Sequence, residues 1–203
     1  MSARRLSFAV LGLALALAGC GKRDTAEILQ PPGTPATLQK YWPVPEFTLT
    51  ESNGQTLHRG DLAGKVWVAE FFYTSCPGPC PVLTSKVGEV QKALGANAEV
   101  RLVSISVDPE KDTPEVLKTY AKRYDAGPNW LFCTGDKAGI VALAHDGFKL
   151  PIAEGTAESG PITHTTRLAL VDKAGTVRGF YDGISEDGVQ ALVHDAGQLL
   201  EGK

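Results

Sequence analysis

Positive charge, cysteine and long hydrophobic runs are all scarce in this sequence of 203 residues. Its 20 Lys and Arg are outnumbered by 23 Asp and Glu, and the net charge of −3 excludes the basic surface of a nucleic-acid-binding protein. Four cysteines are too few for a disulfide-rich scaffold, so each one is judged by its position. No apolar run reaches the roughly 20 residues of a membrane-spanning helix, which excludes a polytopic membrane protein.

The overall composition is that of an ordinary globular protein. Hydrophobic residues make up 43% of the chain and charged residues 21%, which excludes a wholly disordered or collagen-like chain. The length suits one domain of ordinary size together with a tail.

The first twenty residues are typical of an export signal. Arg4 and Arg5 precede a 13-residue apolar run, residues 6–18, which is shorter than a membrane anchor needs. The run ends in Leu17-Ala18-Gly19-Cys20, which resembles a bacterial lipobox. That resemblance implies that Cys20 is lipidated and becomes the mature N-terminus. An uncleaved anchor, or an ordinary signal with an incidental cysteine, is the alternative.

We therefore expect three parts in the chain: a lipoprotein signal peptide at residues 1–19, a lipidated cysteine with a flexible tether at 20–40, and a folded domain at 41–203. The tether is expected because a proline-rich stretch at 31–35 has little apolar periodicity. The expected location is the bacterial cell envelope, anchored by lipid and facing the periplasm or another extracytoplasmic side. This compartment is oxidising, so thiols that stay reduced there need a reason.

Hydrophobic patterns in the folded part alternate between strands and helices. Residues 66–73 are almost continuously apolar, which is typical of a strand covered on both faces. The order predicts a three-layer α/β sandwich of thioredoxin-like type, with a mixed central sheet and an N-terminal β-hairpin. Predicted strands lie at 47–50, 55–58, 66–73, 100–107, 131–133, 165–171 and 176–181. Predicted helices lie at 80–94, 114–124, 137–147 and from 186 onward, the last three capped by Thr113, Asp136 and Ser185.

Two cysteines lie at the predicted junction from this buried strand to the first long helix. Cys76-Pro77-Gly78-Pro79-Cys80 has a three-residue spacer, one residue longer than that of a thioredoxin redox motif. The positive end of a helix dipole favours a thiolate at such a position. Two thiolates this close can form a redox-active disulfide or hold a soft metal ion. A structural disulfide is the plain alternative, although so short a loop gains little stability from one.

A metal at this motif needs a further ligand. Structural zinc usually takes four protein ligands, whereas Cu(I) accepts fewer and prefers sulfur, and imidazole also suits copper. His164 is the candidate, because a thioredoxin-like fold places the start of the predicted strand at 165–171 beside the cysteine loop. The remaining histidines fit less well by position: His58, His145 and His194.

Three ordered segments resemble the Sco/SenC family. They are residues 72–81 with a Cys-Pro-x-x-Cys-Pro signature, residues 104–117, and residues 164–183. The resemblance covers about residues 41–200 and implies a copper site, for Cu(I) or Cu(II), formed by Cys76, Cys80 and His164. One departure is that many relatives carry an acidic residue beside the histidine, where this chain has threonines. An acidic neighbour orients the ring or tunes the metal.

The resemblance further implies an envelope copper metallochaperone that helps to assemble the binuclear copper centre of cytochrome c oxidase. Its expected partners are the copper-bearing subunit of that oxidase or another copper chaperone, with the membrane reached through the lipid anchor. Nucleic acid is not expected as a partner. Binding and transfer of copper involve no catalytic cycle.

A thiol–disulfide oxidoreductase is the alternative function. Cys76 would be the attacking thiolate and Cys80 the resolving thiol, and this activity should survive His164→Ala, whereas copper binding should not. A peroxidase on the same fold ranks last, because its Thr-x-x-Cys spacing is not met at Thr74-Ser75-Cys76.

Three further features receive plainer interpretations. Cys133 lies in an apolar segment and is predicted to be a buried small hydrophobe. Three acidic residues follow the strand at 100–107: Asp108, Glu110 and Asp112. We interpret them as residues that form a turn and cap a helix. The alternative is that they dock a partner or lie near the metal. Residues 148–163 are interpreted as a loop near His164, with a lid or docking surface as the lesser hypothesis.

Overall fold

The computed structural model describes residues 38–95, 97–154, 162–163 and 165–202. All of them belong to one compact unit that spans Ala36–Lys203. Cys20, the expected signal peptide and most of the expected tether lie outside the described residues, as does His164. Within the described part of the chain, no helix is long and apolar enough to cross a membrane.

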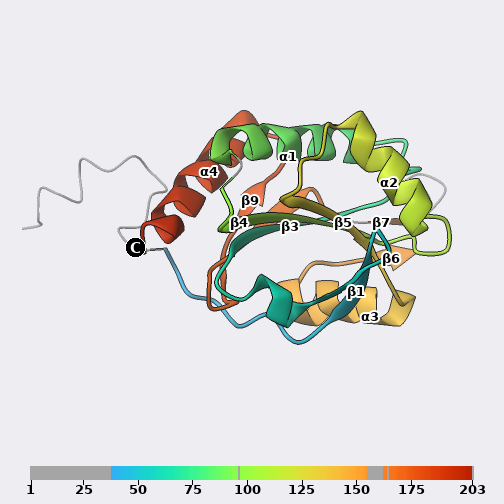
Figure 1. Ribbon diagram of the computed structural model, residues 1–203, viewed down its shortest axis with the longest axis horizontal. Coiled ribbons are helices and arrows are strands. Elements are labelled where there is room, and N and C mark those ends of the chain that lie inside the picture. The colour runs from blue at the N-terminus through green and yellow to red at the C-terminus, as the bar shows by residue number, and fades with distance from the viewer. Residues whose placement is uncertain (1–37, 96, 155–161, 164, 203) are drawn as a thin grey trace, which may run out of the picture. The chain divides into compact units, whose positions relative to one another are not determined.

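A mixed sheet of seven strands forms the middle layer of this unit (Figure 1). Its strands are β1 (Thr48–Glu51), β2 (Thr56–His58), β3 (Val66–Phe72), β4 (Val100–Ser106), β5 (Trp130–Thr134), β8 (Arg167–Val171) and β9 (Val177–Asp182). They lie in the order β2-β1-β5-β4-β3-β8-β9. The central strands β5, β4 and β3 are parallel, and the antiparallel hairpins β1–β2 and β8–β9 form the two edges. The predicted mixed sheet and N-terminal hairpin are confirmed.

Helices cover both faces of this sheet. The helices α1 (Cys80–Leu94), α2 (Pro114–Arg123) and α4 (Glu186–Leu200) lie on one face, and α3 (Lys137–Ala142) lies on the other (Figure 1). This is the predicted three-layer α/β sandwich. Each predicted cap accepts a hydrogen bond from the backbone of its own helix: Thr113 from Val116, Asp136 from Gly139, and Ser185 from Gly188.

Two segments differ from the prediction. The helix predicted to run to Gly147 is α-helical only to Ala142 and continues as a π-helical turn, Leu143–Gly147. In that turn the carbonyl of Gly147 accepts a hydrogen bond from the indole of Trp42 at 2.7 Å. The predicted loop at 148–163 contains two short strands, β6 (Ala153–Glu154) and β7 (Ile162–Thr163), which pair antiparallel. Strands of two residues leave no periodic pattern in a sequence.

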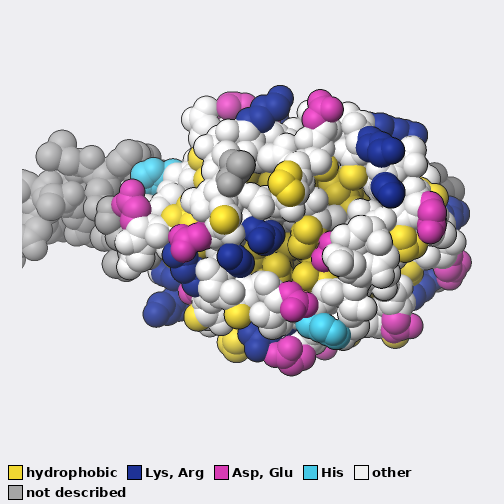
Figure 2. Space-filling view, in the orientation of Figure 1, with side chains coloured by type: hydrophobic (Ala, Val, Ile, Leu, Met, Phe, Trp, Pro, Cys, Tyr) yellow, Lys and Arg dark blue, Asp and Glu magenta, His cyan; other side chains and the backbone are white. Residues whose placement is uncertain are grey.

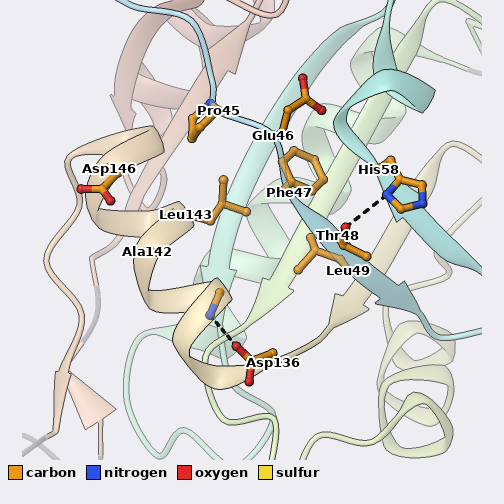
Figure 3. Close-up of a pocket in the computed structure, with 11 residues that line it drawn as sticks. Pro45, Glu46, Phe47, Thr48, Leu49, His58, Asp136, Ala142, Leu143 and Asp146 are labelled. Atoms are coloured by element: carbon orange, nitrogen blue, oxygen red, sulfur yellow. Dashed lines mark hydrogen bonds between the residues drawn. The ribbon is translucent and has the colours of Figure 1, made fainter.

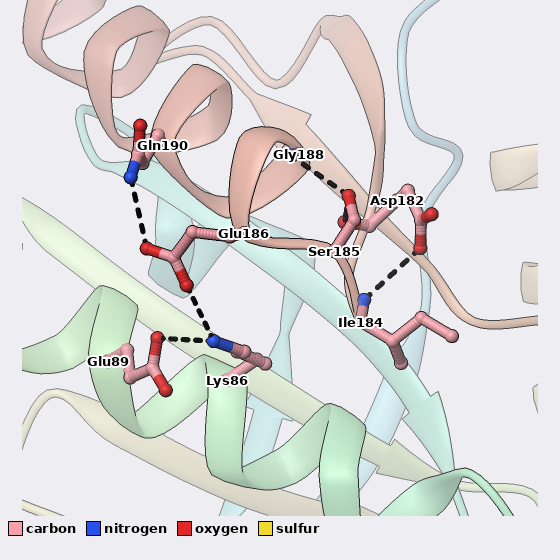
Figure 4. Close-up of polar contacts among 8 residues, drawn as sticks. All are labelled: Lys86, Glu89, Asp182, Ile184, Ser185, Glu186, Gly188 and Gln190. Carbon is pink, nitrogen blue, oxygen red and sulfur yellow. Dashed lines mark hydrogen bonds and ion pairs between the residues drawn. The ribbon is translucent and has the colours of Figure 1, made fainter.

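The second turn of α1 is bonded to the first turn of α4 (Figure 4). The Nζ atom of Lys86 on α1 donates to Glu186 at the start of α4 at 2.8 Å, and to Glu89 at 2.9 Å. In the same view Ser185 caps α4, and Asp182 accepts from the backbone of Ile184 in the turn that leads into α4. The turn after β9 is therefore fixed against α1.

Gly183 in this turn is a point of close approach. A Cβ atom at this position would collide with the side chain of Leu83 on α1 and with the carbonyl oxygen of Thr166. That carbonyl also accepts a hydrogen bond from the N–H of Gly183 at 2.9 Å. Only glycine lets its backbone come so near to the backbone of Thr166 and the side chain of Leu83. As a result, the chain that enters β8 lies beside the first turn of α1.

The first described residues are tied to the C-terminal hairpin. Arg178 on β9 is buried, and its guanidinium donates to the carbonyl of Leu38 at 2.7 Å and to that of Gln39 at 2.9 Å. It also pairs with Asp172 at 3.1 Å. These bonds fix the place where the folded unit begins.

The surface carries charges of both signs. Figure 2 shows Lys and Arg side chains interspersed with Asp and Glu on the face in view, with hydrophobic side chains gathered in its middle. This mixed face agrees with the near balance of charge in the sequence.

A glutamate side chain is buried in a central strand of the sheet. All seven residues of β3 are buried, as predicted, and one of them is Glu70. Its carboxylate accepts hydrogen bonds from the hydroxyls of Thr84, at 2.8 Å, and Ser104. The indole of Trp130 in turn donates to Ser104 at 2.8 Å. Burial raises the pKa of Glu70 to about 7, against the hydroxyl donors, which lower it.

We expect Glu70 to make the stability of the fold depend on pH. Its pKa is about 7 in the folded protein, against 4.5 for an exposed glutamate, so between these values the folded state binds more protons than the unfolded state. The contribution of Glu70 to the free energy of unfolding is then fully present below pH 4.5 and falls by about 3 kcal/mol as pH rises to 7. Glu70→Gln removes this loss, and urea unfolding at pH 5 and pH 8 measures it.

The matched control is Glu110→Gln, because Glu110 is exposed. The control should retain the pH dependence of the unmodified protein. Parallel pH dependences for Glu70→Gln and the unmodified protein would show that Glu70 does not titrate in this range.

Candidate metal and thiol site

The two motif cysteines lie at opposite ends of one tight loop. β3 ends at Phe72, and α1 begins at Cys80, as predicted. Cys76 has 8% of its surface exposed and Cys80 has none, while the three residues between them are exposed. Both cysteines are present as thiols. A partner or a reagent therefore reaches the site from the side of Cys76.

The two thiols differ in acidity. Burial acts to raise the pKa of Cys76, but hydrogen bonds from the backbone and thiol of Cys80 and from the backbone of Gly78 outweigh it and lower the pKa. Burial raises the pKa of the Cys80 thiol, and the nearby charges of Cys76 and Glu70 raise it further. Cys76 is thus the thiol that ionises first, and Cys80 holds its proton.

A buried carboxylate holds the chain that leads to Cys76. Asp112 accepts the N–H of Thr74 at 3.0 Å and the hydroxyl of Thr74 at 2.5 Å. It also accepts the hydroxyl of Ser106, the last residue of β4, at 2.5 Å. The side chain of Asp112 is fully buried. The loop is therefore tied to the neighbouring strand two residues before Cys76.

The interpretation of the acidic group was right for two of its members. Asp108 forms a turn with its carbonyl and pairs with Lys111 at 3.0 Å, and Glu110 is exposed. It was wrong for Asp112, whose side chain neither closes the turn nor caps α2 but binds the cysteine loop. A signal was available: the parallel strands β3 and β4 end side by side, so a hydroxyl after one and an acid after the other become neighbours.

Cys133 is a buried residue of β5, as predicted. Burial raises the pKa of its thiol, with a further contribution from Glu51. It lies opposite Ile105 in the register of β4 and β5. Its protonated state and burial make it part of the core.

The described histidines each have a neighbouring side-chain partner. His58 contacts Thr48 at 3.2 Å, His145 contacts Asp146 at 2.9 Å, and His194 contacts Gln198 at 2.9 Å. In the described part of the chain, no group of three or more His, Cys, Asp and Glu could hold a metal ion. His164 lies outside that part, so the predicted ligand set of Cys76, Cys80 and His164 is not contained in it.

Two cavities bear on where a partner could lie. One of about 540 Å³ lies between β1 and α3, and its lining includes Phe47, His58, Asp136 and Leu143 (Figure 3). Neither Cys76 nor Cys80 lines it. A second cavity, of about 480 Å³, adjoins the cysteine loop, and its lining includes Thr74 and Ser75 together with residues of α2: Glu115, Val116, Thr119, Tyr120 and Arg123.

The chain is similar to one family along most of its length. The SCO1/SenC family model matches residues 35–198. A solved SCO1/SenC family lipoprotein from Bacillus anthracis is 32% identical, with a TM-score of 0.74 over 81% of this chain and 99% of that one.

Two further solved structures are similar. ScoI from Bradyrhizobium japonicum, determined with copper bound, is 28% identical, with a TM-score of 0.66 over 76% of this chain and 98% of that one. BsSco is a member of the Sco family of cytochrome c oxidase assembly proteins in which a disulfide switch has been identified. It is 33% identical, with a TM-score of 0.70 over 80% of this chain and 95% of that one.

We expect the difference in acidity to appear as a difference in reactivity. In reduced protein without metal, iodoacetamide should modify Cys76 first, because it is the more exposed and more acidic thiol. Its rate should exceed that of Cys80 at least about tenfold, since each pKa unit changes the thiolate fraction tenfold. Cys133 should react last. Mass spectrometry of peptides sampled over time measures the order, and modification of Cys80 before Cys76 would contradict it.

Proposed function

This chain belongs to the SCO1/SenC family, and we propose that it is a copper chaperone of the cell envelope. Copper is its cargo, held by the thiolates of Cys76 and Cys80 and by an imidazole nitrogen of His164. The copper is destined for the binuclear centre of cytochrome c oxidase, delivered to the copper-bearing subunit directly or through another chaperone. The observation that carries the proposal is the pair of neighbouring, unequal thiols at the start of α1.

The donor set suits copper better than zinc. Thiolate sulfur is a soft ligand that favours Cu(I), and imidazole suits both oxidation states of copper. Structural zinc usually takes four protein ligands, whereas two thiolates and one imidazole provide three. The relative from Bradyrhizobium japonicum has been determined with copper bound.

The path of the chain supports His164 as the third ligand. The carbonyl of Thr166, two residues later, bonds Gly183 and lies beside Leu83 in the first turn of α1. β8 also runs antiparallel to β3, so the chain enters β8 at the end of the sheet where β3 leaves for the cysteine loop. Both observations concern the chain just after His164, and they bring Thr166 close to the first turn of α1, which begins at Cys80.

Three ligands leave one side of the ion open for transfer. A cysteine or histidine of the acceptor can bind there before a ligand of this chain leaves, so copper is never released into water. Cys76 is the partly exposed ligand, and Cys80 lies beneath it in the helix. We expect the acceptor to approach over the exposed loop and to exchange with Cys76 first.

The redox state of the two cysteines controls loading. A disulfide between Cys76 and Cys80 leaves no thiolate for copper, so only the reduced protein can be loaded. A disulfide switch has been identified in the related BsSco. The same pair supports a second candidate function, reduction of a partner's disulfide, in which the Cys76 thiolate attacks and Cys80 resolves the mixed disulfide. The unequal acidity of the two thiols favours this assignment.

The proposed location is the bacterial cell envelope, where the protein is anchored by lipid and faces the periplasm or another extracytoplasmic side. Residues 1–19 are proposed to be removed as a signal peptide, with Cys20 lipidated and the residues after it serving as a tether. Leu38 and Gln39, which the sequence pattern assigns to the tether at 20–40, are bonded to Arg178 and belong to the folded domain. A relative of similar structure is a lipoprotein. A tether lets the domain reach acceptors in the same membrane.

Copper titration tests the site. The chain from Gly21 onward, which contains the compact unit, is reduced and titrated anaerobically with Cu(I) and then with Cu(II). We expect one copper per chain and a sulfur-to-Cu(II) absorption band. Cys76→Ser, Cys80→Ser and His164→Ala should each lose tight binding and the band, because each removes one ligand.

The matched control is Cys133→Ser, since Cys133 is a thiol of the core away from the loop. It should bind copper as the unmodified chain does. Binding that is indifferent to all three proposed ligands would overturn the site.

His164→Ala separates the two candidate functions. Disulfide exchange needs only the two cysteines, so the rate at which reduced protein cleaves a model disulfide should stay within about twofold of the unmodified chain, while copper binding is lost. A parallel loss of both activities would show that the substitution damages the cysteine loop itself.

A further inference from the structure

We propose that Asp112 is the positioning residue of the copper site, because its buried carboxylate fixes the loop that carries Cys76 to the end of β4. This inference rests on the proposed function, since it concerns how the two cysteines are held for copper. Asp112 touches neither cysteine in any described hydrogen bond and acts through Thr74.

The contacts form a clamp with three donors and one acceptor group. Oδ2 of Asp112 takes the N–H of Thr74 at 3.0 Å and the hydroxyl of Ser106 at 2.5 Å, and Oδ1 takes the hydroxyl of Thr74 at 2.5 Å. Two bonds to one residue fix both its backbone and its side chain. Hydrogen bonds to a carboxylate are about twice as strong as those between neutral groups.

Burial makes the clamp hard to open. Asp112 is fully buried, and among the described contacts its charge is met by hydroxyl and amide donors, while Lys111 pairs with Asp108 instead. A buried carboxylate that loses its donors is strongly disfavoured, so Thr74 cannot move away without a large penalty. The backbone around Asp112 is also fixed. The N–H of Asp112 donates to the carbonyl of Asp108 at 2.9 Å, and the next residue, Thr113, caps α2.

The bonds of Asp112 help to fix the position of Cys76, which the cysteine motif does not fix by itself. Cys80 is held by α1, whose first turn bonds back to the loop: the N–H of Leu83 donates to the carbonyl of Pro79 at 2.9 Å. Cys76 belongs to no helix or strand, and an exposed three-residue spacer separates it from Cys80. Its position depends on its hydrogen bonds with Cys80 and Gly78 and on the chain before it, which Asp112 fixes two residues away. Preorganised ligands bind a metal more tightly than mobile ones, and residues behind the ligands are typically worth 10- to 100-fold in affinity.

Copper competition on Asp112→Asn tests this role. The substitution keeps the size of the side chain but removes its charge and one acceptor. We expect Cu(I) affinity, measured against a chromophoric chelator, to fall about 10- to 100-fold with one copper still bound at saturation. The sulfur-to-Cu(II) band should shift, a change that a loss of stability alone does not produce. Thr74→Val, which removes one of the three donors, should give a smaller loss in the same direction.

Asp136→Asn is the matched control, because Asp136 is a carboxylate that caps α3 through Gly139 at 2.8 Å, on the other face of the sheet. It should leave affinity and band unchanged at a temperature where all variants are folded. If Asp112→Asn does not fold, Thr74→Val and Ser106→Ala carry the test. Unchanged affinity and band in folded clamp variants would overturn the role of Asp112 alone. If the unmodified chain binds no copper, the proposed function fails, and the positioning role fails with it.

Discussion

The parallel pairing of β3 with β4 is the constraint on which the site depends. Seven consecutive residues of each strand are in register, from Val66 opposite Val100 to Phe72 opposite Ser106. Because both strands end at the same edge, the loop after β3 and the turn after β4 lie side by side. Asp112 can then reach Thr74 although 38 positions separate them in the sequence. The cysteine loop is held by a strand to which it is not directly joined.

Sequence patterns were sufficient for the parts of this structure that rest on local physics. The start of α1 at Cys80, the caps at Thr113, Asp136 and Ser185, and the buried strand β3 all follow from local signals. The roles of Asp112 and Glu70 do not, because each is defined by partners that only tertiary structure brings near. The cysteines lie at the junction of β3 and α1, as the hydrophobic pattern predicted, but the unequal acidity of their thiols depends on burial and hydrogen bonds, which the pattern does not reveal.

The two cysteines combine opposite requirements in a short loop. One must ionise easily, so that copper or a partner's sulfur can exchange at it, and Cys76 is the more acidic and the less buried of the two. The other must stay in place while exchange proceeds, and Cys80 does so as the first residue of a helix that is fastened to α4 by Lys86. Copper transfer and disulfide exchange both require one thiol that exchanges readily and one that stays in place. One loop therefore supports both proposals.

The bonds from Arg178 to Leu38 and Gln39 have a consequence for the order in which the domain can be completed. They join residues about 140 positions apart, and β9, which carries Arg178, is the last strand of the chain. Contacts so distant in sequence close late in folding, because a long loop must be ordered before they form. Leu38 and Gln39 are therefore not bonded in place until the C-terminal hairpin, β8–β9, has formed. In a chain that crosses a membrane N-terminus first, the first residues of the domain would form these bonds only after nearly all of the domain had reached the far side.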